Sequence, residues 1–414
     1  MTTATIAIGS PALKRSLALV EQRKRWMAIA LTLPLLLFLL ATLLVPIGAL
    51  LQRAIENPEI AKSLTRTGAA LADWDRTSPP PVAAFAALVA DLGAISEGSD
   101  AGAVARRLNT EASGARSLVM GTYRALPLGD KLTPEQTREK LLALDERWAE
   151  LRYWQAIAKN SSRWTPDYLL TAVDLKRRAE GGIGVVEPEQ RVFSRILLRT
   201  FEISLVVTLW CLVLAYPLAY WLSTLPARRA NVLMILVLVP FWTSILVRVA
   251  AWIVLLQREG LVNKSLVSLS ILGEPATLLF NRTGVVIAMV HILLPYMILP
   301  LYSVMKSVPP TYLRAAVSLG SPPLAAFFRV YVPQTWPGIG AGALLVFILS
   351  IGYYVTPALL GGADDQMLSY YIAQYTNVDI NWGMACALGT VLLTATLLLY
   401  AVYRRVVKTE LSLG

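Results

Sequence analysis

The chain has 414 residues, of which 56% are hydrophobic and only 16% are charged, and its mean hydropathy is +0.55. A soluble domain carries roughly a quarter of its residues as charges, so this composition excludes an ordinary soluble protein and favours an integral membrane protein. The net charge of +11 does not indicate nucleic-acid binding, because basic residues gather at the ends of apolar runs and form no stripe with interleaved aromatics.

The first apolar run follows a basic stretch. Residues 1–25 end in Arg23-Lys24-Arg25, and residues 26–51 contain no charged side chain. A helix of this length crosses a hydrocarbon core about 30 Å thick with some tilt. The run is too long for a signal peptide and has no convincing small-residue cleavage site. We therefore predict an N-terminal tail at 1–25 and a first transmembrane helix at 26–51.

Residues 52–196 interrupt the apolar pattern and are numerous enough to form a domain of their own. Segment 135–150 has apolar residues at helical spacing and good helix formers, and Ser78-Pro79-Pro80-Pro81 breaks the pattern. Strand-like alternation is scarce. The sequence predicts a small helical bundle inserted between the first and second transmembrane helices.

Five more apolar runs follow the insert and form a predicted core at residues 197–410. Their only formal charges are Glu202 and Arg248, and His291 is the only histidine of the chain. The fold class expected is therefore an all-α membrane protein with six transmembrane helices. The five further spans are roughly Thr200–Thr224, Val232–Leu256, Thr283–Met305, Gly338–Leu360 and Gly383–Tyr403.

The distribution of Lys and Arg in the tails and short loops predicts the orientation. With the N-terminus inside, the outer short loops hold only Arg258, Lys264 and Arg282. Both termini are therefore expected in the cytoplasm and the insert outside. The inner segments hold Lys14, Arg15, Arg23, Lys24, Arg25, Arg228, Arg229, Lys306, Arg314, Arg329, Arg404, Arg405 and Lys408.

The most specific motif lies in the loop at 306–337, between the fourth and fifth spans. Ala315-Ala316 is followed by Gly320 and then by Val330 and Val332-Pro333. Glycine can supply a turn conformation, and Pro322 cannot continue the preceding helix. The pattern predicts a short helix, a turn and a second helix.

This loop resembles the Glu-Ala-Ala signature of ABC importer permeases, EAA-x3-G-x9-I-x-L-P, with Arg314 where the family usually has Glu. Segments 239–252, 293–302 and 353–362 are similar to the spermidine/putrescine branch of that family. The resemblance covers about residues 195–410 and does not explain the insert. It implies the type I ABC importer permease fold, in which this loop is a coupling helix that enters a groove of the cytoplasmic ATPase.

The resemblance also implies partners and a location. It places Arg314, Ala315, Ala316, Gly320 and Pro333 at the ATPase contact. The implied partners are two ATPase subunits that bind ATP and Mg²⁺, a periplasmic substrate-binding protein, and a second permease, either a homologous chain in a heterodimer or another copy. The implied location is the bacterial inner membrane, and the leading substrate class is a small polar organic cation such as a polyamine.

Six residues of the spans are candidates for the translocation path: Trp242, Arg248, Trp252, Tyr296, Tyr353 and Tyr354. Aromatic rings can hold an organic cation, although packing and interfacial roles are commoner for any one of them. Arg248 is either a gate residue or, as we favour, a structural cation bonded to carbonyls near the outer leaflet. For His291 an interhelical hydrogen bond is favoured over proton transfer.

Catalytic and metal-binding motifs are absent from the sequence. It contains no GxxxxGK[ST], HExxH or GxSxG pattern, and Cys211 and Cys386 lack metal-ligand spacing. We therefore expect no catalytic residue, metal or cofactor in this chain. A membrane sensor would need a cytoplasmic signalling domain, and an ion-coupled transporter usually has intramembrane carboxylates; both alternatives are less favoured.

Overall fold

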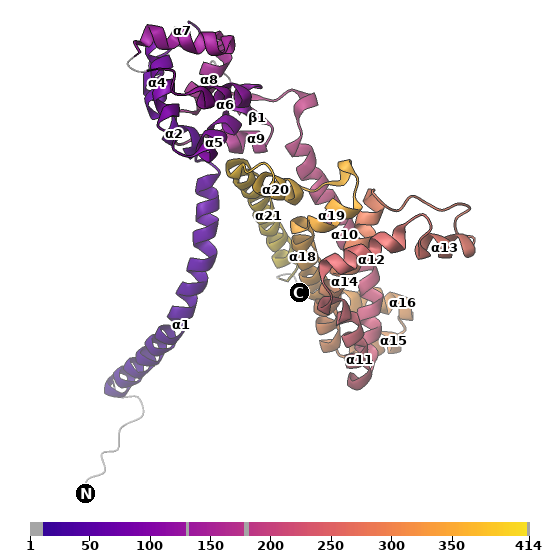
Figure 1. Cartoon of the computed structure of the whole chain (residues 1–414). Coiled ribbons are helices and arrows are strands. Elements are labelled where there is room, and N and C mark those ends of the chain that lie inside the picture. The colour runs from indigo at the N-terminus through magenta and orange to yellow at the C-terminus, as the bar shows by residue number, and fades with distance from the viewer. Residues whose placement is uncertain (1–10, 130–131, 178–181, 412–414) are drawn as a thin grey trace. The chain divides into compact units, whose positions relative to one another are not determined.

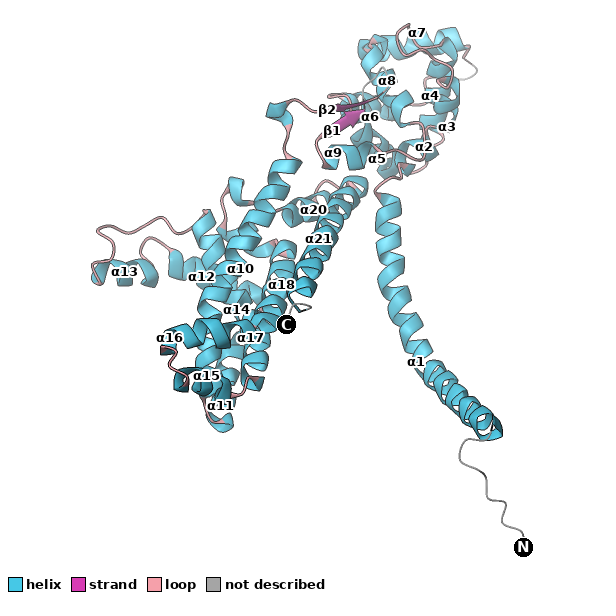
Figure 2. Ribbon diagram, turned by 180° about the vertical axis from the view of Figure 1, so that it is seen from behind, coloured by secondary structure: helices cyan, strands magenta, loops and turns pink. Residues whose placement is uncertain are grey.

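The computed structural model describes residues 11–129, 132–177 and 182–411 (Figure 1). The described chain is helical apart from one short hairpin (Figure 2). Its contacts define two units, one that ends at Arg53 and one that begins at Ala54. The predicted tail at 1–25 lies partly outside the described residues, which begin at Pro11.

The first unit is the helix α1 (Pro11–Arg53), which contains the predicted first span. Its 43 residues correspond to about 65 Å at the usual helical rise. The helix continues N-terminally beyond the apolar run because Lys, Arg, Leu and Glu in that stretch favour helix. The apolar window within Leu19–Arg53 has a hydropathy of 2.7 and no buried residue, as expected for a helix that meets lipid.

The insert is built from short helices and an antiparallel hairpin, in which Lys176 lies opposite Gly184. The hairpin was not predicted, because each strand has only three residues and gives no visible alternation. The elements are α2 (Pro58–Ser63), α3 (Thr65–Ala70), α4 (Val82–Gly93), α5 (Gly98–Asn109), α6 (Ala115–Ala125), α7 (Pro134–Leu144), α8 (Leu151–Asn160), α9 (Asp167–Ala172), β1 (Leu175–Arg177) and β2 (Ile183–Val185).

Helix α7 shows how local sequence sets these boundaries. The hydroxyl of Thr133 accepts a hydrogen bond from the N–H of Gln136, and the side chain of Gln136 accepts one from the N–H of Thr133. This capping box starts the helix. The helix ends at Asp145, whose carboxylate accepts a hydrogen bond from the N–H of Arg147 and so competes with the helical backbone. Segment 135–150 is therefore two helical pieces.

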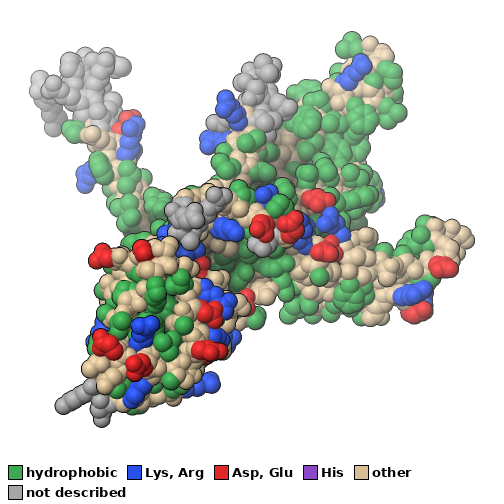
Figure 3. Space-filling view, turned by 90° about the horizontal axis from the view of Figure 1, so that it is seen from above, with side chains coloured by type: hydrophobic (Ala, Val, Ile, Leu, Met, Phe, Trp, Pro, Cys, Tyr) green, Lys and Arg blue, Asp and Glu red, His purple; other side chains and the backbone are tan. Residues whose placement is uncertain are grey.

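Two tryptophans form the centre of the insert's own core. Trp148 and Trp154 are fully buried, with ring centroids 5.4 Å apart. The indole of Trp148 donates to the hydroxyl of Thr122 at 3.0 Å, and that of Trp154 donates to the carbonyl of Trp148 at 2.8 Å, so each buried N–H is satisfied. Acidic and basic side chains are interspersed over the insert's surface (Figure 3). The insert is thus packed like a domain that folds in water.

The second part of this unit contains the apolar helices. Within the described residues, α1, α10, α14 and α21 are each long and apolar enough to cross a membrane, and six spans result if each of two bent pairs is one span. The helices are α10 (Phe193–Thr224), α11 (Ala227–Leu238), α12 (Ile245–Leu256), α13 (Leu261–Ser268), α14 (Arg282–Ser307), α18 (Trp336–Gly352), α19 (Val355–Leu360), α20 (Leu368–Asn377) and α21 (Trp382–Leu411).

Two of the predicted spans are not single straight helices. The segment predicted at Val232–Leu256 bends by 95° where α11 and its 3-10 extension meet α12. Pro240 lies in that extension and has no N–H to continue the helical hydrogen bonds. The span predicted at Gly338–Leu360 ends earlier, at Gly352, and is bent by 63° from the helical segment Pro323–Gln334 that precedes it.

Helices α10, α14 and α18 pack closely because small residues lie between them. A Cβ added to Gly342 would lie 2.7 Å from the sulfur of Met297, and one added to Gly338 would lie 3.0 Å from the Cβ of Val304. Ala215 and Ala219 of α10 are also fully buried. Such residues let helix backbones approach each other in lipid, where burial of larger apolar side chains gives little preference.

The insert is attached to the start of α10 by Asp174. One carboxylate oxygen accepts from the N–H groups of Val192 and Phe193, both at 3.1 Å, and the other accepts from the N–H of Ser194 at 2.7 Å. These are otherwise unsatisfied donors of a helix N-terminus. Burial raises the pKa of Asp174, but the hydrogen bonds from the Ser194 hydroxyl and these N–H groups outweigh burial and hold the pKa below its usual value.

A second attachment joins α9 to α21. Gly383 lies against the ring of Tyr168, and a Cβ at position 383 would be only 2.5 Å from two of its ring atoms. Tyr168 belongs to a buried cluster with Met384 and Leu388 of α21. A glycine is therefore required at 383 for this close approach.

Candidate functional site

The loop predicted to couple to an ATPase has the expected helix–turn–helix form. Helix α15 (Pro310–Ser318) is capped by Leu319 and followed by Gly320, which has φ +92°. The N–H of Gly320 donates to the carbonyl of Val317, and the N–H of Ser321 donates to the carbonyl of Ala316, which together form a Schellman cap. Helix α16 (Pro323–Ala326) follows. The turn therefore depends on the left-handed conformation that glycine adopts readily.

The second half of this loop contains a π-helical turn at Phe327–Tyr331, which leads into α17 (Val332–Gln334). Pro333 lies just after the turn. Proline has no N–H, and its ring clashes with the carbonyl four residues earlier, which explains the wider turn.

Aromatic residues anchor this turn on α10. The ring of Phe327 stacks on Tyr331 at 5.4 Å, and the ring of Tyr220 meets both, at 5.1 and 5.2 Å. The hydroxyl of Tyr216 is hydrogen-bonded to that of Thr335 at 3.0 Å. The sequence shows Tyr216 and Tyr220 only as aromatic residues of a transmembrane span. Their contacts with this loop could not be predicted, because the partners are more than a hundred residues away.

The helix pair presents an apolar surface. Leu319, Leu324 and Phe328 are 89%, 75% and 64% exposed, respectively. Arg314 and Ala315 are exposed and Ala316 is half-buried. Among the described residues, nothing covers these side chains, and an exposed apolar patch of this kind is typical of a protein contact.

The structure brings together four of the six path candidates. The indole of Trp252 donates to Nδ1 of His291 at 3.2 Å, which is the interhelical hydrogen bond favoured for that histidine. Arg248 is close enough to interact electrostatically with His291 and Tyr353, and Tyr353 with Tyr296. Trp242, by contrast, is 75% exposed, and Tyr354 is also exposed.

Arg248 is the unusual member of this group. Its Nε and one terminal nitrogen are buried, and neither has a hydrogen-bond partner among the described residues. Carbonyl partners were expected for these donors. Arg248 as a whole is half-buried, and both the gate interpretation and the structural interpretation of this residue stay predictions.

A groove of about 680 Å³ lies beside this group on α10, α12 and α14. Trp252 and His291 line it together with Trp210 and several aliphatic residues, and the lining is almost entirely apolar. Arg282 and Thr283 at the start of α14 are polar members of the lining.

An ion network ties the ends of three segments together. Arg282 at the start of α14 donates to Glu202 of α10 at 2.8 Å and to Asp365 at 3.4 Å. Asp365 also accepts from the N–H of Gly362. Arg282 is 80 or more positions from both carboxylates, so their pairing could not be predicted from the sequence.

No group of three or more His, Cys, Asp or Glu in the described part of the chain is placed to hold a metal ion. Cys211 and Cys386 form no disulfide in the described part of the chain, and the thiol of Cys211 donates to the carbonyl of Val290. Both fit the interpretation as small packing residues.

Comparison with known proteins gives a family and several relatives. The family described as "Binding-protein-dependent transport system inner membrane component" matches residues 203–409. The spermidine/putrescine transport system permease protein PotB of Salmonella typhimurium strain SL1344 is 34% identical over 224 residues, covering 53% of this chain and 78% of that protein. PotB of Escherichia coli strain K12 is 35% identical over 215 residues, covering 52% and 78%. A chain of a solved bacterial alginate ABC transporter is 18% identical with a TM-score of 0.42, covering 53% of this chain and 80% of that one.

Proposed function

Because the chain belongs to the family of inner membrane components of binding-protein-dependent transport systems, we propose that it is the subunit through which an ABC importer moves a polyamine. The chain is a multi-pass membrane permease subunit, and in its family a separate ATPase hydrolyses ATP. The observation that carries the substrate class is the identity of 34–35% to spermidine/putrescine permeases across the apolar helices.

The path candidates suit an organic cation. Trp252, Tyr296 and Tyr353 present aromatic rings near one another, and ring faces attract ammonium groups. The charge of Arg248 has the opposite effect, because like charges repel strongly where water is excluded. We therefore place Arg248 at a gate of the path and the aromatic rings at the substrate.

Docking of an ATPase at α15–α16 is supported by the exposed apolar surface around Leu319 and Leu324. Small residues at Ala315 and Ala316 allow close approach of a partner, and Pro333 shapes the turn behind them. Arg314 gives this surface a positive charge where related permeases usually carry Glu, so its partner groove should offer a carboxylate.

The remaining assembly follows from the same proposal. The asymmetry of Lys and Arg supports cytoplasmic termini and a periplasmic insert. The partners are two ATPase subunits that bind ATP and Mg²⁺, a second permease, homologous or identical, and a periplasmic binding protein. This chain needs no cofactor of its own.

Uptake by whole cells tests the substrate class. Deletion of the gene should abolish energy-dependent uptake of radiolabelled putrescine or spermidine, and the wild-type chain supplied on a plasmid should restore it. Unchanged uptake of both polyamines in the deletion strain would refute the substrate class. Copurification of an ATPase with the tagged chain tests the permease role separately.

A further inference from the structure

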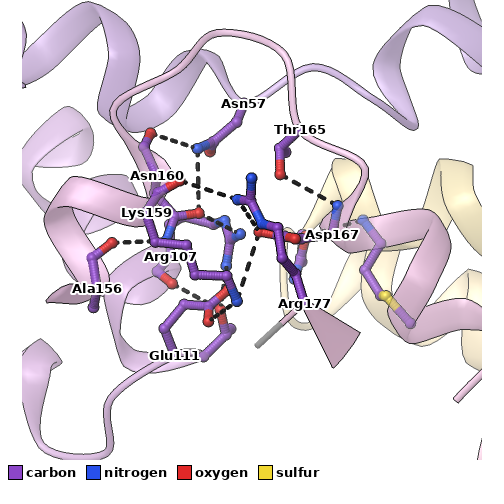
Figure 4. Close-up of polar contacts among 12 residues, drawn as sticks. Asn57, Arg107, Glu111, Ala156, Lys159, Asn160, Thr165, Asp167 and Arg177 are labelled. Atoms are coloured by element: carbon purple, nitrogen blue, oxygen red, sulfur yellow. Dashed lines mark hydrogen bonds and ion pairs between the residues drawn. The ribbon is translucent and has the colours of Figure 1, made fainter. Parts of the chain in front are cut away.

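A polar pocket of about 370 Å³ lies outside the membrane helices, between the insert and the α20–α21 connection. Arg107 of α5, Lys159 of α8 and Asp167 of α9 line its insert side, and Tyr375 and Asn381 line its other side. Figure 4 shows the insert residues converging from separate elements. The pocket is far in sequence from the candidate path and from the coupling loop, and neither uses it.

The acidic residues of this pocket are already paired. Glu111 accepts from Arg107 at 3.2 Å and from Lys159 at 2.8 Å. Asp167 accepts from Arg177 at 3.0 Å and lies 3.6 Å from Lys159 through the same oxygen. The cations are held in place by these pairs, as Figure 4 shows.

The pocket nevertheless has an excess of positive charge. Two carboxylates, Glu111 and Asp167, face four cations: Arg107, Lys159, Lys176 and Arg177. The side chain of Lys176 is exposed at the pocket, and its ammonium group has no hydrogen-bond partner among the described residues. The excess of two charges and the free N–H groups favour a ligand that accepts hydrogen bonds and carries negative charge.

Two deeply buried atoms also lack partners. Arg107 and Asp167 are only 7% and 5% exposed. Nε of Arg107 and the second carboxylate oxygen of Asp167 have no hydrogen-bond partner in the described part of the chain. Both atoms are enclosed by the protein, so the cationic groups that an occupant of the pocket can reach most readily are those of Lys176 and Arg177.

We propose that this pocket binds a small oxyanion, a carboxylate or a phosphate group. Its anionic oxygens accept hydrogen bonds from Lys176 and Arg177, and the excess positive charge of the pocket adds to the attraction. Inorganic phosphate is the simplest probe.

Occupancy would strengthen the attachment of the insert to α21. The side-chain oxygen of Asn381 accepts from the N–H of Met384 at 3.1 Å and so caps the first turn of α21. Tyr168, whose ring lies 4.7 Å from the guanidinium of Arg107, packs on Gly383 of the same turn. A bound anion would hold the cations of the insert beside this turn.

The experiment is isothermal titration of the full chain in a detergent without phosphate, with potassium phosphate at pH 6.5 and potassium chloride at equal ionic strength as the blank. For the wild type, the heat of phosphate binding should decline to the blank value as the site becomes saturated. Lys176→Gln should weaken phosphate binding by about tenfold, the loss expected for one charge-assisted contact. Lys62→Gln, an exposed lysine of α2 outside the pocket, should bind phosphate as wild type does, and Lys176→Arg should retain most of the affinity.

Nanodiscs identify the natural source of the anion. If the site takes a lipid headgroup, phosphate binding should persist in phosphatidylcholine discs and disappear in discs rich in phosphatidylglycerol; binding that is equal in both identifies a soluble anion. Absence of phosphate heat above the chloride blank in detergent would overturn the proposal. So would equal loss in Lys62→Gln and Lys176→Gln, because binding would then reflect net charge alone.

Discussion

The insert and the membrane helices of this chain are held together by different contacts. The insert buries large side chains such as Trp148 and Trp154 and satisfies their N–H groups. Helices α14 and α18 instead meet at Gly338 and Gly342 of α18, against which the side chains of Val304 and Met297 of α14 lie closely. In water, burial of apolar surface stabilises the insert by about 25 cal/mol of free energy per Å². In lipid, burial of apolar side chains contributes little, and close packing is the main attraction between helices.

Charges are distributed according to the same difference. In the insert, ion pairs such as Lys159–Glu111 and Arg177–Asp167 surround a polar pocket. In the membrane region, the described ion pairs lie at the ends of spans, at Arg282 with Glu202 and Asp365. Changes of the same kind should therefore have different effects in the two regions.

The largest effect is expected in the core of the insert. Trp148→Ala removes a fully buried ring and should destabilise the insert by about 3–5 kcal/mol. Trypsin should then cut within 52–196 while the membrane helices remain protected in detergent. Trp164→Ala, at a tryptophan that is half-exposed, is the matched control and should leave the insert resistant. Simultaneous loss of both regions would show that they do not fold separately.

A smaller effect is expected where two membrane helices touch. Gly342→Leu places carbon atoms within 3 Å of Met297, and overpacking of this kind costs about 1–3 kcal/mol. Thermal unfolding of the detergent-solubilised chain should occur at lower temperature, with the insert still resistant to trypsin. Gly352→Leu at the end of the same helix meets nothing within 4 Å and should behave as wild type. Equal melting temperatures for the two variants would contradict close packing as the stabilising contact.

The coupling loop should show loss of function with little loss of stability. Gly320→Leu forces a side chain into a left-handed conformation, at about 1–2 kcal/mol, and should abolish uptake and ATPase copurification while the membrane helices remain folded. Gly273→Leu, at an open position without positive φ, is the control. The Arg314→Glu variant should retain both substrate uptake and copurification of the ATPase. Normal uptake by Gly320→Leu would refute the coupling role.

The smallest effect is expected at the cap of α10. Asp174→Asn keeps the shape but loses the charge that faces four donors, and should cost about 1 kcal/mol. Because folding lowers the pKa of Asp174, its contribution is complete above the unfolded pKa of about 4 and is lost as pH falls through the lower folded value. The free energies of unfolding of wild type and variant should therefore differ at pH 7, and this difference should shrink as the pH falls below the unfolded pKa of Asp174. A constant difference would show that charge is not the cause.

The sequence predicted the long apolar helices because their signal is local. Runs such as 26–51 and Gly383–Tyr403 show their character within one window, and the glycine turn at 320 follows from a single residue type. The bend near Thr243 could not be located in this way, because residues on both sides of it are equally apolar. Pro240 lies next to the bend, but the presence of a proline does not give the angle of 95°.

Contacts between distant segments could not be predicted from the sequence for a different reason. The pairing of Arg282 with Glu202 and the edge-on contact of Phe327 with Tyr220 join residues 80 or more positions apart. One sequence gives the chemical type of each side chain but not its neighbour. The polar pocket of the insert was missed for the same reason, since Arg107 and Asp167 belong to different helices.

The hydrogen bond from Trp252 to His291 gives the protein a built-in spectroscopic label. His291 is the only histidine, and because its Nδ1 accepts the indole N–H, a neutral ring must carry its proton on Nε2. An untagged, ¹⁵N-histidine-labelled chain therefore contains a single imidazole whose two nitrogen shifts report one tautomer. Opening of the α12–α14 contact during transport would release Nδ1 and change those shifts, so a single resonance would follow the motion of the permease.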